Sequence, residues 1–381
     1  MKVLIVNRYL SIYGGAETVV KNLALELKKM GVENLILALN TTRDKNIYKD
    51  LNIITPSKEF PYLLRSSSFI SSCGILKEIL ILRRLVKKYV EDFDLINVHN
   101  FPASWIAGNL NKPVVWMCNE VPDFYNMLKP SLKMKILRFL GISLDRYIVN
   151  KTIDTICVAE EFGRENVFRR YKRDAEVVPY GIEFESFLEE PAIPEYEYLK
   201  DYFLVLQVGM VTLQKNQFEA VKAIKELKEK IPNIKLILAG KEEKFYADFL
   251  KRYIEENALN EDIIFTGHLS KEKIFALYKI CKLAVFPVKT QGGWLSPFEA
   301  LCMAKPIIVS TTMGASNLIK KYNLGIVSNE LTKSIFDIYN NYDFFLQRAK
   351  EASLWVKNNL TWERFAKRML EIFQKTLERK R

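Results

Sequence analysis

Residues 203–227 read FLVLQVGMVTLQKNQFEAVKAIKEL and show the pattern on which the fold is built. Residues 203–208 form a short apolar run that ends at Gly209, which is typical of a buried strand. Apolar residues then recur at helical spacing, at Phe218, Val221, Ile224 and Leu227. The stretch therefore predicts a strand, a loop and a helix in succession.

The same pattern runs through both halves of the chain. Apolar runs predict strands at 3–6, 34–39, 95–99, 113–117, 155–158, 203–208, 234–239, 263–265, 283–286 and 307–310. Helical periodicity predicts helices between Ala16 and Gly31, at 75–90, 218–227, 271–280 and 316–321, and one that begins at Pro297. Strands that alternate with helices predict parallel sheets covered on both faces. We expect an α/β protein of two Rossmann-like domains that face a cleft.

Length and composition agree with two folded domains. At roughly 150 residues per domain, 381 residues make two to three domains. Hydrophobic residues make up 49% of the chain and charged residues 27%, which excludes disordered, collagen-like and disulfide-knotted chains. The stretch from Glu189 to Tyr198 carries two prolines and four glutamates with no usable period, so it predicts a linker between the domains.

The chain has 57 Lys and Arg against 45 Asp and Glu, and this net charge of +12 indicates an anionic ligand, surface or partner. Residues 128–151 hold six basic residues against Asp145 alone: Lys129, Lys133, Lys135, Arg138, Arg146 and Lys151. Apolar residues interleave with them, so the segment fits a helix on an anionic membrane surface or a core helix with a solvated basic face. Both interpretations stay open. No recognition motif accompanies the charge, so we expect no nucleic-acid partner.

Cysteine spacing and the N-terminal residues bear on location. Five cysteines, Cys73, Cys118, Cys157, Cys281 and Cys302, are widely spaced without a C-x-x-C pair, so we expect neither a disulfide framework nor a metal site. The first residues hold too few apolar side chains for a signal peptide, and no run approaches the roughly 18 of a membrane span. We expect a cytoplasmic protein, with a peripheral position on the inner face of the cell membrane if 128–151 binds lipid.

Three loops at the ends of predicted strands carry candidate binding residues. Gly14 and Gly15 precede the first helix, whose N–H groups and dipole favour an anion, although an ordinary glycine turn has the same sequence. Lys215 lies at the edge where doubly wound sheets bind ligands, although a lone lysine is more often solvated. The third loop runs from Gln291 into Ser296-Pro-Phe-Glu299, which also fits a capping box.

With further motifs, these residues resemble the retaining nucleotide-sugar glycosyltransferases of family 4. Gln291 and Glu299 stand eight positions apart, and Glu299 opens the stretch EALCMAKP, residues 299–306. The ordered set is completed by Gly14-Gly-Ala-Glu17, Asp94-Leu-Ile-Asn-Val-His99-Asn100, Val178-Pro-Tyr-Gly-Ile182 with Phe187, and Val208-Gly209 leading to Lys215-Asn216. The resemblance spans almost the whole chain and implies the two-domain GT-B fold.

The resemblance also implies the domain limits. The N-terminal, acceptor-binding domain would cover residues 1–190, and the C-terminal domain, which binds the nucleotide-sugar donor, residues 191–360. Residues 361–381 would form a helix that packs back on the first domain, because Trp362 and Phe365 match the start of that helix in the family.

Site residues follow from the same resemblance. Lys215 would contact the donor diphosphate and Glu299 the donor ribose, and Gly209 would also lie in the donor site. His99, which taken alone would be a structural histidine at a strand end, would lie near the donor sugar in the catalytic centre, together with Gln291 and Glu299. The other donor-binding candidates are Gly15, His268, Gly292, Gly293, Trp294 and Leu295, and the acceptor-side candidates are Gly14, Gly15, Asn119 and Glu120.

Three positions depart from the family pattern. Gln291 stands where a glutamate is usual, Met210 stands where an arginine is usual, and a glutamate that is common near Asn317 is absent. Gln291 forms hydrogen bonds but carries no charge. Loss of one charge-assisted phosphate contact at Met210 costs about 1.5–3 kcal/mol. We therefore expect donor binding to survive, with turnover the more sensitive property.

The resemblance implies a retaining, metal-independent transferase that needs no cofactor beyond its nucleotide diphosphate sugar co-substrate. The acceptor would be a hydroxyl of a sugar or lipid-linked molecule, in glycan, glycolipid or cell-surface polysaccharide synthesis. Two alternatives remain. Gln291 and Met210 favour a catalytically impaired GT-B scaffold or nucleotide-sugar-binding protein. A GT-B nucleotide-sugar epimerase, which needs no acceptor, is the other.

Overall fold

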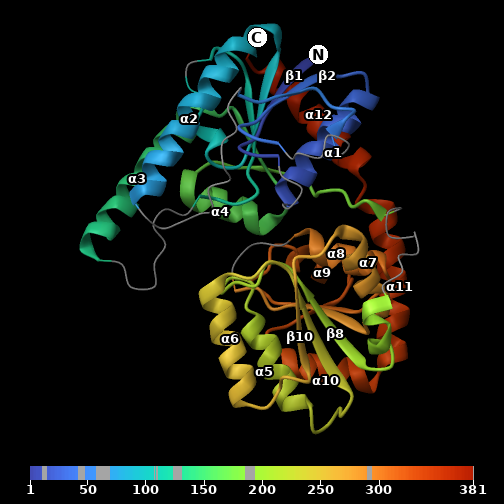
Figure 1. Ribbon diagram of the computed structural model, residues 1–381. Helices are drawn as coiled ribbons and strands as arrows, with labels where there is room; N and C mark the ends of the chain where they lie inside the picture. The colour runs from blue at the N-terminus through green and yellow to red at the C-terminus, as the bar shows by residue number, and fades with distance from the viewer. Residues whose placement is uncertain are drawn as a thin grey trace. The chain divides into compact units, whose positions relative to one another are not determined.

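The computed structural model describes residues 1–10, 15–41, 48–56, 69–106, 108, 110–122, 131–184, 194–289 and 294–380, with the backbone alone for 69–73. The chain divides into two compact units (Figure 1). Unit 1 joins Met1–Gly181 with Trp362–Arg381, and unit 2 is Ile182–Thr361. Of the predicted linker, the part from Pro194 is described, and it forms a short 3-10 helix, η5 (Pro194–Leu199).

Unit 1 is built on a sheet that has seven parallel strands in the described part of the chain, in the order β3-β2-β1-β4-β5-β6-β7. The strands are β1 (Lys2–Val6), β2 (Glu33–Leu37), β3 (Ile53–Ile54), β4 (Leu95–His99), β5 (Val114–Met117), β6 (Thr155–Val158) and β7 (Glu176–Val177). Central strands such as β4 are buried along their whole length. A parallel sheet covered on both faces needs such continuous apolar runs, which is why these strands were visible in the sequence.

The helices of unit 1 cover both faces of this sheet. They are α1 (Gly15–Lys29), α2 (Phe69–Tyr89), α3 (Leu132–Thr152), α4 (Glu161–Tyr171) and α12 (Trp362–Glu378), with 3-10 turns η2 (Val90–Asp92) and η3 (Ala103–Trp105). Figure 1 shows α1 and α12 together on one side of the sheet and α2 on the other. Trp362, Phe365, Met369 and Phe373 form the buried stripe of α12. The C-terminal helix thus belongs to the first unit, as the predicted fold required.

Unit 2 holds a second parallel sheet, with the order β10-β9-β8-β11-β12-β13 among the described residues. Its strands are β8 (Phe203–Val208), β9 (Ile234–Ala239), β10 (Ile263–Gly267), β11 (Leu283–Phe286), β12 (Ile307–Val309) and β13 (Ile326–Val327). Its helices are α5 (Gln217–Leu227), α6 (Lys244–Glu256), α7 (Lys271–Ile280), α8 (Leu295–Cys302), α9 (Ser316–Lys321), α10 (Leu331–Asn340) and α11 (Tyr342–Asn359). Helix α5 packs against α10, and α8 against α11.

Helix α8 begins earlier than the sequence predicts, and the predicted capping box is wrong. The helix starts at Leu295, and its N-cap residue, Trp294, makes no side-chain cap bond. Ser296 therefore lies inside the first turn, where its carbonyl accepts a hydrogen bond from the Tyr278 hydroxyl (3.2 Å). Pro297 fits there because N–H groups of the first turn have no helical partner. Glu299 is therefore not engaged in closing its own helix.

Each sheet has one point at which the strand order reverses. In unit 1 this point lies between β1 and β4, and in unit 2 it lies between β8 and β11. Doubly wound sheets bind ligands outside the carboxyl ends of the strands at such a switch point. The fold thus marks two places, one in each unit, where a ligand is expected.

Candidate functional site

At the switch point of unit 2, the strand ends pack backbone against backbone. The N–H of Gly209 donates to Ala239 (2.9 Å), and the N–H of Gly240 donates to Gly267 (2.9 Å). A Cβ atom on Gly240 would lie 2.1 Å from the carbonyl oxygen of Gly209, so no larger residue fits. Gly209 was a predicted site residue, but Gly240 was missed, because a single glycine after a strand is a weak signal.

Gly209 and Gly240 together form a glycine platform, and Lys215 lies over its Gly209 side. Two carbons of its stem approach within 3.9 Å of the position of a Cβ on Gly209. Two hydrogen bonds fix the loop that carries Lys215. The Gln207 side chain donates to the Lys215 carbonyl (2.9 Å), and the Lys215 N–H donates to the Thr212 carbonyl (3.0 Å). Asn216 then takes a left-handed φ of 55°, a value that Asn tolerates well, and α5 begins. A half-buried lysine is thus held beside half-buried glycine backbone at the sheet edge.

Glu299 is half-buried on α8, which follows β11 on the other side of the switch point. Burial raises the pKa of its carboxyl to about 7, Lys271 opposes this shift, and Glu183 adds to it. Trp294 is buried against Phe298, with ring centroids 4.5 Å apart, and Leu295 opens the helix. Glu299 therefore titrates near neutral pH in the absence of a ligand.

The remaining donor-side candidates divide into three groups. His268 is exposed directly after β10. Met210 has 47% of its surface exposed, so an apolar side chain faces solvent where the family usually has an arginine. Gln291, Gly292 and Gly293 lie outside the described residues.

At the switch point of unit 1, His99 ends β4 with its side chain fully buried. Its Nε2 atom lies 2.8 Å from Oδ1 of Asn97, and no described residue forms a hydrogen bond with Nδ1. Burial lowers the pKa of the ring to about 3, so His99 is neutral. Gly15 begins α1 after β1, the strand beside β4, whereas Gly14 lies outside the described residues.

Two further residues of unit 1 complete the candidate set. Asn119 is half-buried after β5 and accepts a hydrogen bond from the buried hydroxyl of Tyr180, and Glu120 is exposed. Glu17 lies in the first turn of α1, and burial raises its pKa to about 7. Burial, together with the nearby charge of Glu17, raises the pKa of Tyr48 to about 12. The sequence reasoning treated Glu17 only as a favourable first-turn residue.

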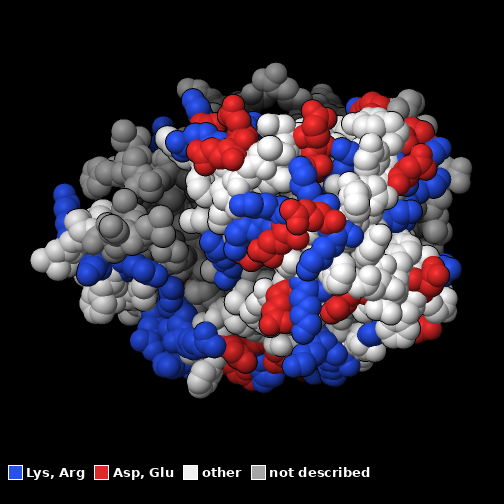
Figure 2. All heavy atoms as spheres, turned by 90° about the horizontal axis from the view of Figure 1, so that it is seen from below, with Lys and Arg blue, Asp and Glu red and all other residues white. Residues whose placement is uncertain are grey.

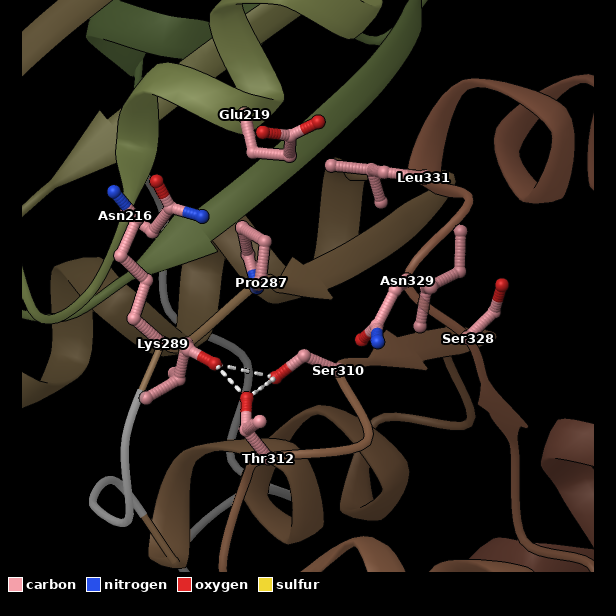
Figure 3. A pocket seen from close by; sticks show the side chains of 11 residues that line it. Asn216, Glu219, Pro287, Lys289, Ser310, Thr312, Ser328, Asn329 and Leu331 are labelled. Carbon is pink, nitrogen blue, oxygen red and sulfur yellow. Dashed lines mark hydrogen bonds between the residues drawn. The ribbon is translucent and has the colours of Figure 1, made fainter.

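A cavity of about 310 Å³ lies at the carboxyl edge of unit 2, on the side of α5 and α10 (Figure 3). Asn216, Lys289, Thr312 and Asn329 are among its lining residues. Within it, the hydroxyls of Ser310 and Thr312 both donate to the Val288 carbonyl. Neither Lys215 nor Glu299 is among its lining residues, although Asn216, which follows Lys215, is.

The basic segment 128–151 is described from Ser131, and its apolar residues are turned outward. Six large apolar side chains of α3 are exposed: Leu132, Ile136, Phe139, Leu140, Leu144 and Tyr147. Asp145 is buried instead, where it accepts hydrogen bonds from Trp105 (2.7 Å) and Tyr171 (2.6 Å). The interpretation as a core helix is therefore wrong for the part of α3 that carries these side chains, whereas Val149 near its C-terminus packs into the core of unit 1. On the face that Figure 2 draws, basic and acidic side chains intermingle over much of the surface.

The described part of the chain holds neither a metal cluster nor a membrane-spanning helix. No group of three or more His, Cys, Asp or Glu comes together to hold a metal ion in that part of the chain. No described helix combines the length and hydropathy needed to span a bilayer. Cys118, Cys157, Cys281 and Cys302 are buried free thiols.

Comparison with known proteins extends these observations. The model of Glycosyltransferase Family 4 matches residues 13–186, and that of Glycosyl transferases group 1 matches residues 190–334. An alpha-monoglucosyldiacylglycerol synthase of Streptococcus pneumoniae is 23% identical over 344 residues, which are 84% of this chain and 74% of that protein.

Two solved structures share the fold. HepE of Anabaena, crystallised with UDP-glucose, has a TM-score of 0.76 at 15% identity. The match covers 98% of this chain and 100% of the HepE chain. Sucrose-phosphate synthase of Thermosynechococcus elongatus has a TM-score of 0.79 at 16% identity, with both chains covered completely. The architecture is the two-domain, Rossmann-like GT-B fold. The chain belongs to the group 1 and family 4 glycosyltransferases, and it is a glycosyltransferase by class.

Proposed function

We propose that this glycosyltransferase moves a sugar from a nucleoside diphosphate sugar to a hydroxyl acceptor with retention of configuration. The observation that carries the proposal is Lys215 held over Gly209 at the switch point of unit 2. A cation beside closely packed glycine backbone suits a diphosphate, and Glu299 across the switch point suits the hydroxyls of a ribose. The structural relative HepE, which was crystallised with UDP-glucose, supports the same class of donor.

In the proposed reaction, the bond from the anomeric carbon to the donor phosphate oxygen breaks, and a bond to the acceptor oxygen forms on the same face. The acceptor proton passes to the departing phosphate oxygen. Lys215 and the N-terminus of α8 stabilise the charge that develops on the diphosphate, so the proposed mechanism requires no metal ion. His99 hydrogen bonds to the sugar, and Asn119 and Glu120 lie on the acceptor side.

The donor class is tested by thermal-shift titration with uridine, guanosine and adenosine diphosphates. One diphosphate should raise the melting temperature at micromolar concentration, and the matching nucleoside should do so only weakly. The preferred diphosphate sugar is then incubated with hydroxyl acceptors, and the anomeric configuration of the product is read by NMR. An inverted product would reject retention, and the absence of stabilisation by all three diphosphates would reject the donor site.

Met210 favours one alternative, a GT-B protein that binds nucleotide sugars without transferring them. Its exposed side chain supplies no charge to a phosphate. Donor binding measured by calorimetry, without product across the acceptor panel, would establish this alternative. Conversion of the nucleotide sugar without any acceptor would indicate an epimerase instead.

We also propose that the protein is peripheral on the cytoplasmic face of an anionic membrane, through α3. Leu132, Ile136, Leu140 and Leu144 recur every four residues and form one exposed stripe. Lys133, Lys135, Arg146 and Lys151 are exposed on the same helix. An apolar stripe flanked by lysine and arginine suits the interface of a bilayer with anionic headgroups. The similarity to a synthase named for a glucosyldiacylglycerol supports a lipid acceptor.

Co-sedimentation tests the membrane proposal with vesicles of phosphatidylglycerol and phosphatidylcholine. The protein should sediment with anionic vesicles at low salt, and replacement of Phe139 and Leu140 by serine should reduce this binding at least tenfold. Phe245→Ser, at an exposed phenylalanine on α6, is the matched control and should bind like the parent. Absence of binding at low salt, or equal loss in the control, would reject the proposal.

A further inference from the structure

Asn97 and His99 form a buried polar pair on β4. They are two residues apart on a strand, so their side chains point to the same face of the sheet. Both side chains are fully buried. Asn97 Nδ2 donates to the carbonyl of Val115 on β5 (3.1 Å), and Asn97 Oδ1 lies 2.8 Å from His99 Nε2.

The orientation of the Asn97 amide follows from its partner on β5. The Val115 carbonyl can only accept a hydrogen bond, so the atom of Asn97 that faces it must be the NH₂ group. A flipped amide would set two acceptor oxygens against each other. Oδ1 is therefore the atom that faces the His99 ring.

This orientation determines where His99 carries its proton. Asn97 Oδ1 is only an acceptor, so Nε2 must be the protonated nitrogen. The ring is neutral because burial disfavours the imidazolium form. Nδ1 is thereby left as a bare acceptor, buried and without a partner among the described residues.

We infer that Asn97 is a positioning residue, which holds His99 as the Nε2–H tautomer so that Nδ1 can accept a hydrogen bond from a hydroxyl of the transferred sugar. The identification of the ligand as a transferred sugar rests on the proposed function. A neutral ring with a free lone pair suits a hydroxyl and not a phosphate oxygen, which has no proton to donate. Buried hydrogen-bond acceptors rarely lack a partner. An acceptor at a switch point that has no partner among the described residues is therefore consistent with a bound ligand.

The tautomer can be measured directly, because the chain has two histidines, His99 and His268. In long-range ¹H–¹⁵N spectra of the His268→Gln variant, the imidazole signals that remain are those of His99. The expected spectrum shows a protonated Nε2 and an unprotonated Nδ1, unchanged between pH 5 and 8. A protonated Nδ1, or an imidazolium that titrates in this range, would overturn the inference without any variant of Asn97.

Asn97→Ala tests the positioning role. Loss of the acceptor should mix the two tautomers and lower kcat about tenfold, with little change in KM for the donor. Asn34→Ala is the matched control, because Asn34 is also buried in unit 1 and donates to the carbonyls of Ala24 and Val32. It should lose comparable thermal stability but keep the tautomer and kcat. Equal kinetic loss in both variants would reduce Asn97 to a structural residue and overturn the inference.

Contact with the sugar is tested with UDP-glucose and GDP-mannose and with their monodeoxy analogues. Removal of one hydroxyl should lower kcat/KM about tenfold in the parent and have little effect in His99→Ala. The same loss in both proteins would reject the contact. If neither donor binds, the proposed function fails while the tautomer result stands, so the two failures are distinguishable.

Discussion

The two switch points are similar in topology and differ in chemistry. In unit 2, Lys215 lies over a platform of packed glycine backbone. In unit 1, His99 is neutral and buried, and among the described residues its ring forms a hydrogen bond with the amide of Asn97. One edge offers a positive charge and close backbone, whereas the other offers an uncharged hydrogen-bond acceptor.

Under the proposed function, one strand-loop-helix pattern serves two kinds of ligand. A diphosphate needs cations and N–H groups, and a sugar hydroxyl needs neutral acceptors. Both edges also carry a carboxyl whose pKa burial raises to about 7, Glu17 in unit 1 and Glu299 in unit 2. Variants can therefore separate the two edges.

Gly240→Ala should have the largest effect, because it removes the glycine platform of unit 2. The new Cβ would lie 2.1 Å from the Gly209 carbonyl oxygen, and the clash should cost about 3 kcal/mol or more of the free energy of unfolding. Thermal and urea unfolding measure it. Gly31→Ala is the control, because nothing lies within 4 Å of its Cβ position, and its φ of 75° adds only about 1 kcal/mol of strain. Equal losses in the two variants would contradict the tight packing.

Lys215→Ala should weaken binding of a nucleoside diphosphate by roughly 10- to 100-fold, the worth of one charge-assisted hydrogen bond. Affinity for the nucleoside alone should not change, since it lacks the phosphates. Calorimetry measures both ligands. Lys244→Ala, at an exposed lysine on α6, should bind like the parent. A loss that is the same for nucleoside and diphosphate would place Lys215 away from the phosphates.

Donor affinity should fall about tenfold as the pH drops from 8 to 6, if ionised Glu299 accepts the ribose hydroxyls. With a pKa of about 7, the carboxylate changes from mostly ionised to mostly protonated over this range. Glu299→Gln should bind more weakly with a flat pH profile. Glu17→Gln keeps Glu299 and should retain the slope. A slope that disappears only in Glu17→Gln would assign the titration to unit 1.

The pH dependence of stability is an independent check on the same two carboxyls. Burial raises the pKa of Glu17 and Glu299 from 4.5 to about 7, so the native state binds more protons than the unfolded state between these values. The free energy of unfolding should therefore fall as the pH rises from 5 to 7. Glu17→Gln and Glu299→Gln should each flatten this slope in urea titrations. An increase in stability over this range that both variants retain would contradict the shifted pKa values.

Buried strands were predictable from the sequence because each is a continuous apolar run. β4, β6, β8, β9 and β11 occupy the residues that the sequence predicts. β3, β7 and β13 were missed, since two residues carry no periodicity, and only pairing with a neighbour defines them. The start of α8 was misplaced because proline and serine gave a convincing cap signal that the packing of Trp294 on Phe298 overrides.

Candidate site residues were predictable where they belong to a sequence motif. They were not predictable where only their contacts in the folded structure identify them. Lys215, His99 and Glu299 came from motifs, and all three lie at or beside the switch points. Asn97 gave no signal, because its role depends on a carbonyl of β5 that lies 18 residues away in the sequence. The sequence likewise could not decide whether the apolar stripe of α3 is exposed. Periodicity shows that a helix has an apolar face but not whether anything covers that face.

Hydrogen exchange with bound ligand tests most directly whether the diphosphate binds at the edge of unit 2. The stabilising nucleoside diphosphate should slow exchange in peptides that cover residues 209–217 and 294–303, while peptides around 95–105 should exchange at the rate of the free protein. Protection confined to residues 95–105, with unchanged exchange after β8 and along α8, would contradict the division of chemistry between the two switch points.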